Sequence, residues 1–142
     1  MRADGAGAEI MRRGGNAIDA AVAVGFAQAV VNPRAGNIGG GGFLVYRQAN
    51  GDVFSLDYRE TAPAAASRNM YLDSAGNLTE SSVIGALAAG VPGSVAGMWE
   101  MQRRLGRLPW RDVVAPAIAL ARAHVVDSAR HNVIRGNQRS LA

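Results

Sequence analysis

An arginine followed directly by a glutamate, Arg59-Glu60, stands at the end of a predicted strand in this chain of 142 residues. Arginine carries a permanent positive charge, and its planar guanidinium can donate parallel hydrogen bonds to both oxygens of a carboxylate. Arg59 could therefore bind an anionic ligand. Glu60 could hold the arginine in place, or the two side chains could form an ordinary ion pair. The residue types alone leave both interpretations open.

A run of four glycines precedes another predicted strand, and its members are Gly39, Gly40, Gly41 and Gly42. Glycine lets backbone N–H groups approach a phosphate, but two phosphate-binding motifs do not fit. A P-loop needs a lysine, and the chain contains none. The dinucleotide fingerprint follows a strand and begins a helix, whereas here a helix comes first and Leu44 occupies the third glycine position. We therefore predict a structural role, at a close crossing of two backbone segments.

Metal-binding residues are few. The chain has no cysteine, which excludes disulfides, thiolate ligands and cysteine nucleophiles. His124 and His131 are seven residues apart in a predicted helical region, and Asp127 is the only other candidate ligand near them. We predict no metal site.

The positive charge comes entirely from arginine, because all fifteen basic residues are of this type. Eight of them lie between Arg103 and Arg139, with only Asp112 and Asp127 as acidic neighbours. Such a stretch could bind nucleic acid, but Trp110 is the only aromatic residue among these arginines. We therefore favour a solvated helical face over a nucleic-acid-binding surface.

Helical patterns begin and end the chain. The first is predicted over residues 3–13 and is stopped by Gly14-Gly15. Asn16 can cap a second helix over residues 17–31, with Asp19 at a position where the helix dipole favours a negative charge. Small side chains cover that helix, which suits close packing against a sheet. Further helices are predicted over residues 94–105, 109–123 (with a kink at Pro116) and 127–139.

A β-hairpin is predicted over residues 43–47 and 53–58, with its turn at Asn50-Gly51. Residues 59–90 form a long loop of the kind that wraps a surface or lines a site. The fold class is therefore α+β, and we treat residues 1–142 as a single partial domain. A two-stranded hairpin is marginal by itself, so the architecture is incomplete. No apolar run is long enough to span a membrane, and the first residues lack the pattern of a signal peptide.

Six sequence blocks resemble the start of the large subunit of the gamma-glutamyltransferase family, in the family's order and at about its spacing. They are AGAEI over residues 6–10, GGNAIDAAVA over 14–23, the stretch from Asn-Pro to GNIGGGGF over 32–43, DYRETAP over 57–63, GVPGSVAG over 90–97 and LPW over 108–110. The match extends into the 120s and then fades, where the sequence is about one residue short of the family pattern. The family normally has a strand and a short Pro-Leu-Ala-Ser-like segment before the first helix, and we expect the given sequence to start after them.

This resemblance implies an N-terminal-nucleophile hydrolase, whose four-layer αββα fold stacks two sheets between helices. It implies a precursor that cleaves itself, so that the new N-terminal threonine of the small subunit becomes the nucleophile. The family transfers or hydrolyses the gamma-glutamyl group of glutathione and related amides and needs no cofactor. Arg59 matches the arginine that binds the substrate's alpha-carboxylate, and Glu60 could support it. The glycine run matches a packing element.

The nucleophile itself is expected to lie outside this chain, so no catalytic residue is predicted within it. Thr61 and Thr79 are internal and lack the free alpha-amine that the mechanism uses as a base. Ser81-Ser82 has no histidine near it in the sequence. We therefore expect the chain to be inactive alone and to need a small subunit as partner. The alternative is an inactive remnant that binds another protein. The family resemblance implies a periplasmic or secreted location, on which the sequence itself is silent.

Overall fold

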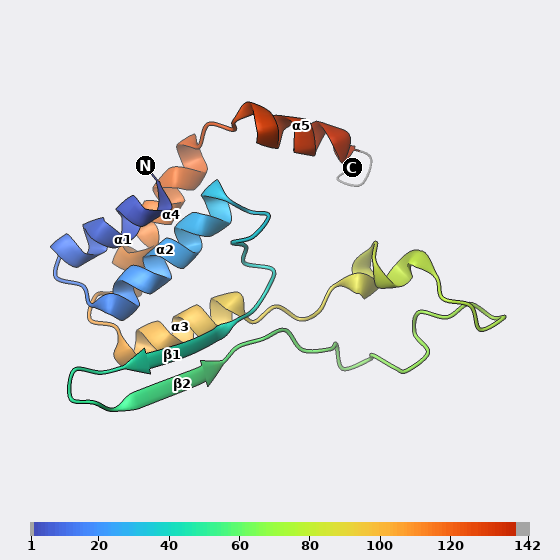
Figure 1. Cartoon of the computed structure of the whole chain (residues 1–142), viewed down its shortest axis with the longest axis horizontal. Coiled ribbons are helices and arrows are strands. Elements are labelled where there is room, and N and C mark those ends of the chain that lie inside the picture. The colour runs from blue at the N-terminus through green and yellow to red at the C-terminus, as the bar shows by residue number, and fades with distance from the viewer. Residues whose placement is uncertain (1, 139–142) are drawn as a thin grey trace.

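The structure, a computed structural model, describes residues 2–138 as five α-helices and one β-hairpin (Figure 1). In chain order the elements are α1 (Ala3–Arg12), α2 (Ala17–Val31), β1 (Phe43–Arg47), β2 (Val53–Asp57), the short 3₁₀ helices η1 (Glu80–Ser82) and η2 (Ala86–Ala88), α3 (Ser94–Leu105), α4 (Trp110–Ala123) and α5 (Ser128–Gly136). The predicted α+β class is confirmed. Within the described residues, no helix has the length and apolar character needed to cross a membrane.

The turn between α1 and α2 follows from local sequence signals. Gly14 has a φ of 91°, in the left-handed region that glycine reaches without steric cost. The side-chain oxygen of Asn16 accepts hydrogen bonds from the N–H groups of Ile18 and Asp19, at 2.9 and 3.1 Å. Asp19 in return accepts a 2.7 Å hydrogen bond from the Asn16 N–H. This reciprocal capping box confirms the predicted helix start.

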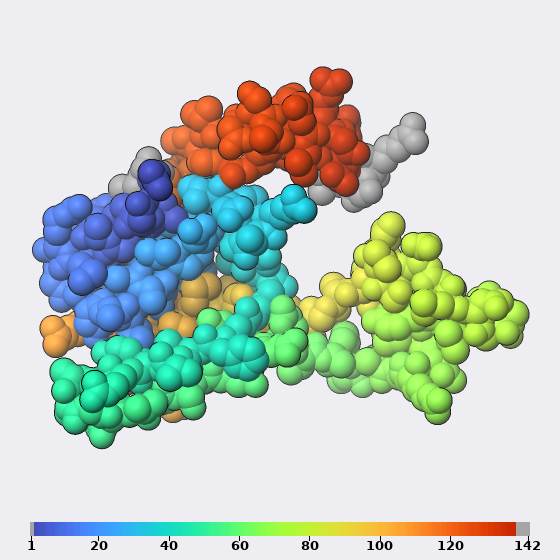
Figure 2. Space-filling model, in the orientation of Figure 1, coloured from blue at the N-terminus to red at the C-terminus, as the bar shows by residue number. Residues whose placement is uncertain are grey.

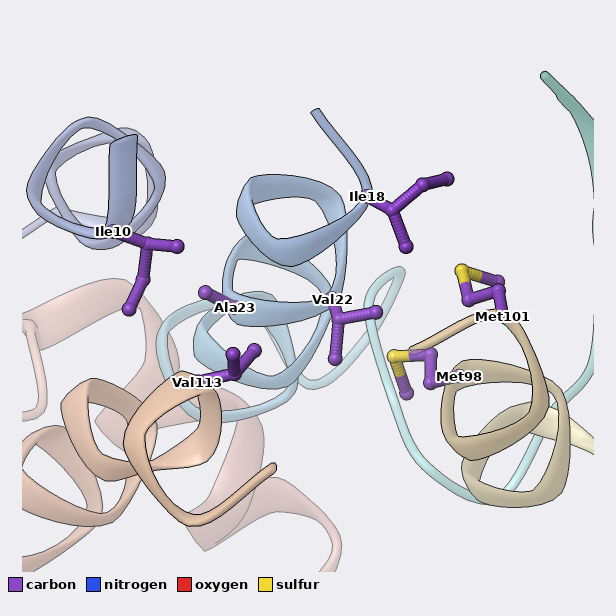
Figure 3. Packing of buried hydrophobic residues seen from close by; sticks show 7 residues of the cluster. All are labelled: Ile10, Ile18, Val22, Ala23, Met98, Met101 and Val113. Atoms are coloured by element: carbon purple, nitrogen blue, oxygen red, sulfur yellow. The ribbon is translucent and has the colours of Figure 1, made fainter. Parts of the chain in front are cut away.

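The hydrophobic core lies where α1, α2, α3 and α4 meet (Figure 3). Its buried members are Ile10, Ile18, Val22, Ala23, Met98, Met101 and Val113. Glycines bring the helices close together: a Cβ added to Gly7 would lie 2.7 Å from Val24 Cγ2, and one added to Gly25 would lie 2.8 Å from Met98 Sδ. The small side chains of α2 thus serve helix–helix packing rather than the predicted packing on a sheet. The helix that contacts β2 is α3.

The hairpin is antiparallel, as predicted, and Phe43 pairs with Asp57 at its open end. Because alternate residues of a strand face opposite sides, one face packs on the core and the other points away from it. The inner face contributes Leu44, Tyr46 and Leu56. The outer face leaves Phe43, Val45 and Val53 exposed at 65%, 76% and 66%. The outer face of the hairpin therefore carries three exposed hydrophobic side chains among the polar residues Arg47, Ser55 and Asp57.

Residues 61–91 form an arm that extends away from the helices (Figures 1 and 2). Two backbone hydrogen bonds close its base, from the Thr61 N–H to the Val91 carbonyl at 3.2 Å and from the Val91 N–H to the Thr61 carbonyl at 2.9 Å. A second bridge joins Leu72 and Leu78 inside the arm. The predicted loop over residues 59–90 is thus confirmed as mainly irregular, but it stands clear of the body instead of wrapping it.

α4 packs against α2, and α5 follows it across the top of the molecule in the view of Figure 1. α4 passes through the buried Pro116 without interruption. Asp127 caps α5 by accepting a 2.8 Å hydrogen bond from the Arg130 N–H. The Arg130 guanidinium donates to the Val31 carbonyl and lies 2.7 Å from His124 Nε2, which ties α5 to the end of α2. The predicted end of this helix at Arg139 falls outside the described residues.

Candidate functional site

Arg59 lies two residues after the end of β2, and its side chain is exposed. Its main-chain N–H donates a 3.0 Å hydrogen bond to Asp57 Oδ1. The guanidinium carbon lies 5.8 Å from the centroid of the Phe43 ring, which is within the range of a cation–π interaction. Among residues 2–138 no carboxylate forms an ion pair with this guanidinium. Its hydrogen-bond donors are thus available to a ligand.

Two glycines from different parts of the sequence lie close against the main chain at Tyr58 and Arg59. A Cβ added to Gly41 would lie 2.6 Å from the Tyr58 carbonyl oxygen and 2.7 Å from Arg59 Cα. A Cβ added to Gly93, just before α3, would overlap the same carbonyl oxygen. The two segments are also joined directly, because the Gly40 carbonyl accepts hydrogen bonds of 2.9 Å from the Gly93 and Ser94 N–H groups.

Tyr58 packs against the core and so holds the same segment in place. Its N–H donates a 2.9 Å hydrogen bond to the Gly42 carbonyl. Its ring lies over Gly97 of α3, where a Cβ would overlap ring atoms, and against Gly42, where a Cβ would lie 2.9 Å from the hydroxyl oxygen. The residue before Arg59 is therefore packed against the core, while Arg59 itself faces outward.

Glu60 does not pair with Arg59 in the described structure. Its Oε1 lies 3.3 Å from the position that a Cβ on Gly40 would take, and its Cβ lies 3.2 Å from the corresponding position on Gly90. Glu60 thus stands beside the glycine run rather than over the arginine. A direct ion pair between the two residues is absent here, and support of Arg59 by Glu60 stays a prediction.

No second chemical centre stands out in the part of the chain that the structure describes. Within residues 2–138, no group of three or more histidine, cysteine or acidic residues could hold a metal ion. His124 contacts Arg130 instead. An apolar groove of about 680 Å³ runs beside α2 and α4, lined by residues such as Phe26, Trp110 and Ile118. Its lining does not include Arg59, and an apolar groove does not suit a charged amino-acid group.

The sequence profile of the gamma-glutamyltranspeptidase family matches residues 3–142. The chain belongs to this family. The profile match reaches the end of the sequence, whereas the two relatives described below align over 80% and 82% of the chain. Two solved structures similar to the chain carry the same family name, and the helices and hairpin described above are one part of the αββα fold of the N-terminal-nucleophile hydrolases.

Individual relatives agree with the profile. The glutathione hydrolase proenzyme of Pseudomonas aeruginosa is 55% identical over 115 residues, which cover 80% of this chain and 20% of that protein. The Escherichia coli glutathione hydrolase proenzyme is 50% identical over 117 residues, covering 82% of this chain and 20% of that protein. The crystal structure of Helicobacter pylori gamma-glutamyltranspeptidase superposes with a TM-score of 0.89 at 46% identity, over 97% of this chain and 40% of that one. The chain spans about a fifth of the length of the curated relatives it matches.

Sequence reasoning singled out Arg59 but missed the residues that surround it. Gly93 and Gly97 lie within a block that resembles the gamma-glutamyltranspeptidase family, yet nothing in the sequence indicates that they meet Tyr58 and Arg59. The sequence predicts Phe43 as a strand residue and gives no sign of its contact with Arg59. A contact between segments this far apart becomes visible only when the hairpin register and the position of α3 are known.

Proposed function

We propose that this chain forms part of an enzyme that transfers or hydrolyses the gamma-glutamyl group of glutathione and related amides. The observation that carries the proposal is membership of the gamma-glutamyltranspeptidase family over residues 3–142. The names of the relatives, glutathione hydrolase proenzymes, support the same substrate class. Residues 1–142 contribute to substrate binding, and the nucleophile lies outside them.

Arg59 is the residue that we assign to the substrate's alpha-carboxylate. Its exposed guanidinium, without an ion-pair partner among residues 2–138, supports this assignment. Two parallel N–H donors can meet both carboxylate oxygens, which fixes the direction of the ligand as well as binding it. The rest of the gamma-glutamyl group then extends away from Arg59 toward the reacting carbonyl.

We place the nucleophile, the N-terminal threonine of a small subunit, outside residues 1–142. Its oxygen would attack the gamma-carbonyl carbon and expel the amine, and water or an amino acid would then take the acyl group. In the described part of this chain, no serine or threonine hydroxyl hydrogen-bonds a histidine. Thr79 Oγ1, for example, donates to the Tyr71 carbonyl at 2.9 Å and accepts from the Ser81 N–H at 3.3 Å. This chemistry needs no metal or organic cofactor.

The partner that follows from this proposal is the small subunit of the same precursor. The word proenzyme in the names of the relatives supports processing of a precursor. A periplasmic or secreted location is part of the proposal, and cell fractionation followed by detection of the protein would test it. Recovery in the cytoplasmic fraction alone would contradict that location.

The decisive experiment is a segment exchange. The matching segment of the Pseudomonas aeruginosa proenzyme is replaced by this chain, and release of 4-nitroaniline from gamma-glutamyl-4-nitroanilide is measured. We expect activity from the exchanged enzyme and none from residues 1–142 alone. Arg59→Ala should raise KM by about 10-fold or more, since a charge-assisted bond is lost. Arg68→Ala, at an exposed arginine of the arm, is the matched control and should leave KM unchanged.

Two outcomes would overturn the proposal. Activity from residues 1–142 alone would show that the chain contains its own nucleophile. An unchanged KM in Arg59→Ala, with Arg68→Ala also unchanged, would remove the carboxylate-binding role of Arg59.

A second candidate function is an inactive remnant that binds another protein. The observation that favours it is the exposure of Phe43, Val45 and Val53 on the outer face of the hairpin, next to strand edges that could pair with another chain. This function predicts concentration-dependent association of residues 1–142 in sedimentation experiments, abolished by Val45→Asp. It would be rejected if the chain stayed monomeric at all concentrations.

A further inference from the structure

Close packing, and not an unusual backbone conformation, requires glycine at positions 41 and 93. The glycines with positive φ among the described residues are Gly14, Gly51 and two in the arm, so neither of this pair adopts a conformation that only glycine allows. What a side chain at either position would meet is the main chain of Tyr58 and Arg59. These contacts are to backbone atoms, which cannot turn aside as the end of a flexible side chain can. Gly41 and Gly93 thus both pack directly against the main chain of Tyr58 and Arg59, which a side chain at either position would displace.

The side chain of Arg59 has a contact of its own at the end of the hairpin. Phe43, the first residue of β1, pairs with Asp57, the last residue of β2. Asp57 accepts the hydrogen bond from the Arg59 N–H, and the Phe43 ring lies 5.8 Å from the guanidinium carbon. A guanidinium lying over a ring keeps the N–H groups at its edge free for a ligand. The same strand pair therefore contacts both ends of Arg59.

We infer that Gly41, Gly93 and Phe43 are positioning residues for Arg59: the glycines fix its main chain and the ring fixes the direction of its guanidinium. This inference rests on the proposed function, because it concerns how the carboxylate-binding group is held. An exposed arginine has many rotamers, and ordering it on binding lowers affinity. Holding it in place beforehand reduces that loss, so displacement of Arg59 should weaken substrate binding before it affects the chemical step.

The first test uses the segment-exchanged enzyme. Phe43→Leu, which removes the ring from an exposed position, should raise KM for gamma-glutamyl-4-nitroanilide about 2- to 5-fold with kcat unchanged. Gly41→Ala should raise KM about 10-fold or more, because displacement of a positioned group by a fraction of an ångström is costly. Val45→Ala is the control for Phe43, since it lies on the same face of β1. Gly39→Ala is the control for Gly41, since a Cβ there has nothing closer than Asn37 Oδ1 at 3.5 Å.

A double-mutant cycle separates positioning from a general structural effect. In an Arg59→Ala background, Phe43→Leu and Gly41→Ala should cause no further loss of kcat/KM, because the group that they position is already gone. Losses that add fully to that of Arg59→Ala would overturn the inference while leaving the proposed function intact. An Arg59→Ala enzyme with normal KM would instead overturn the proposed role of Arg59.

A second test needs no catalytic activity. In residues 1–142, the main chain at Arg59 is packed against Gly41 and Gly93 and should enter the active site of trypsin less easily than the exposed arm. We therefore expect slower cleavage after Arg59 than after Arg68. Gly41→Ala should accelerate cleavage after Arg59 without changing the rate at Arg68, and Gly39→Ala should change neither rate. Equal rates at Arg59 in the Gly41→Ala and Gly39→Ala chains would overturn the positioning of the main chain.

Discussion

Asp19 Oδ1 accepts a 3.1 Å hydrogen bond from the main-chain N–H of Leu108, a residue 89 positions further along the chain. The same carboxylate, which is fully buried, also accepts from the Arg107 N–H at 3.1 Å and from Gln102 Nε2 at 2.5 Å. With the capping bond from Asn16, a single charged side chain joins the start of α2 to the connection between α3 and α4.

Replacing Asp19 by asparagine should lower the free energy of unfolding by about 2–4 kcal/mol. Asparagine has nearly the same shape, but its amide nitrogen would face N–H groups that need an acceptor, and the charge that strengthens these bonds is lost. Urea unfolding of residues 1–142, followed by tryptophan fluorescence, measures the change. Asp4→Asn, at an exposed position in α1, is the matched control. A difference below about 0.5 kcal/mol between the two variants would show that the network contributes little.

The stability of the fold should decrease in acid through the same group. Burial by itself would raise the pKa of Asp19, but hydrogen bonds from Asn16, Gln102, Arg107 and Leu108 outweigh it and hold the pKa below its ordinary value. An unfolded aspartate titrates near pH ~3.9, so the contribution of Asp19 is complete above that pH. It is lost as pH falls further through the folded pKa, because the unfolded chain then binds the proton more readily. Urea midpoints measured between neutral pH and pH ~3 should fall less steeply in Asp19→Asn.

Two neighbouring residues of α1 offer a test of the core. Ile10 is fully buried against α2 and α4, whereas Met11 is 58% exposed. Ile10→Ala should cost about 2–5 kcal/mol of unfolding free energy, since it removes buried methyl groups and leaves a cavity. Met11→Ala should cost well under about 1 kcal/mol. Similar losses in both variants, measured by urea unfolding, would contradict the packing of α1.

The arm should be the first part of the chain that trypsin cuts. The chain has no lysine, and Arg68 is the only arginine between Arg59 and Arg103. Arg68 is exposed on the arm, and exposed loops are the preferred sites of cleavage. Mass spectrometry of an early digest should show a cut after Arg68 while the helical body keeps its circular dichroism signal. First cleavage within α3, after Arg103 or Arg104, would contradict this order.

Local signals were enough to predict the helix ends and the hairpin. Gly14 and Asn16 act on their immediate neighbours, and Asn50-Gly51 lies within the turn that it forms, so their effects can be derived from adjacent residues. The family resemblance likewise depends on short blocks of sequence. These features explain why α1, α2, β1 and β2 lie within a residue or so of their predicted positions.

Contacts between distant segments could not be derived in this way. Asp19 was predicted as a helix-start residue, which is correct, but its bonds to Arg107 and Leu108 depend on where α3 ends in space. The small side chains of α2 suit a sheet and a helix equally well, and only the positions of α1, α3 and α4 in space show that they pack on helices. For the same reason the contact of Gly93 with Tyr58 was not foreseen, although both residues lie in blocks shared with the family.

The bridge between Thr61 and Val91 closes the base of the arm. The positions of the elements on either side of it therefore do not depend on how many residues the arm contains. The entropy cost of closing a loop grows slowly, by about 0.6 kcal/mol for each doubling of its length. Insertions or deletions near the exposed turn at Gly76 would therefore leave the hairpin and α3 in register. The arm would thus tolerate changes in its length at this turn while the surroundings of Arg59 stay the same.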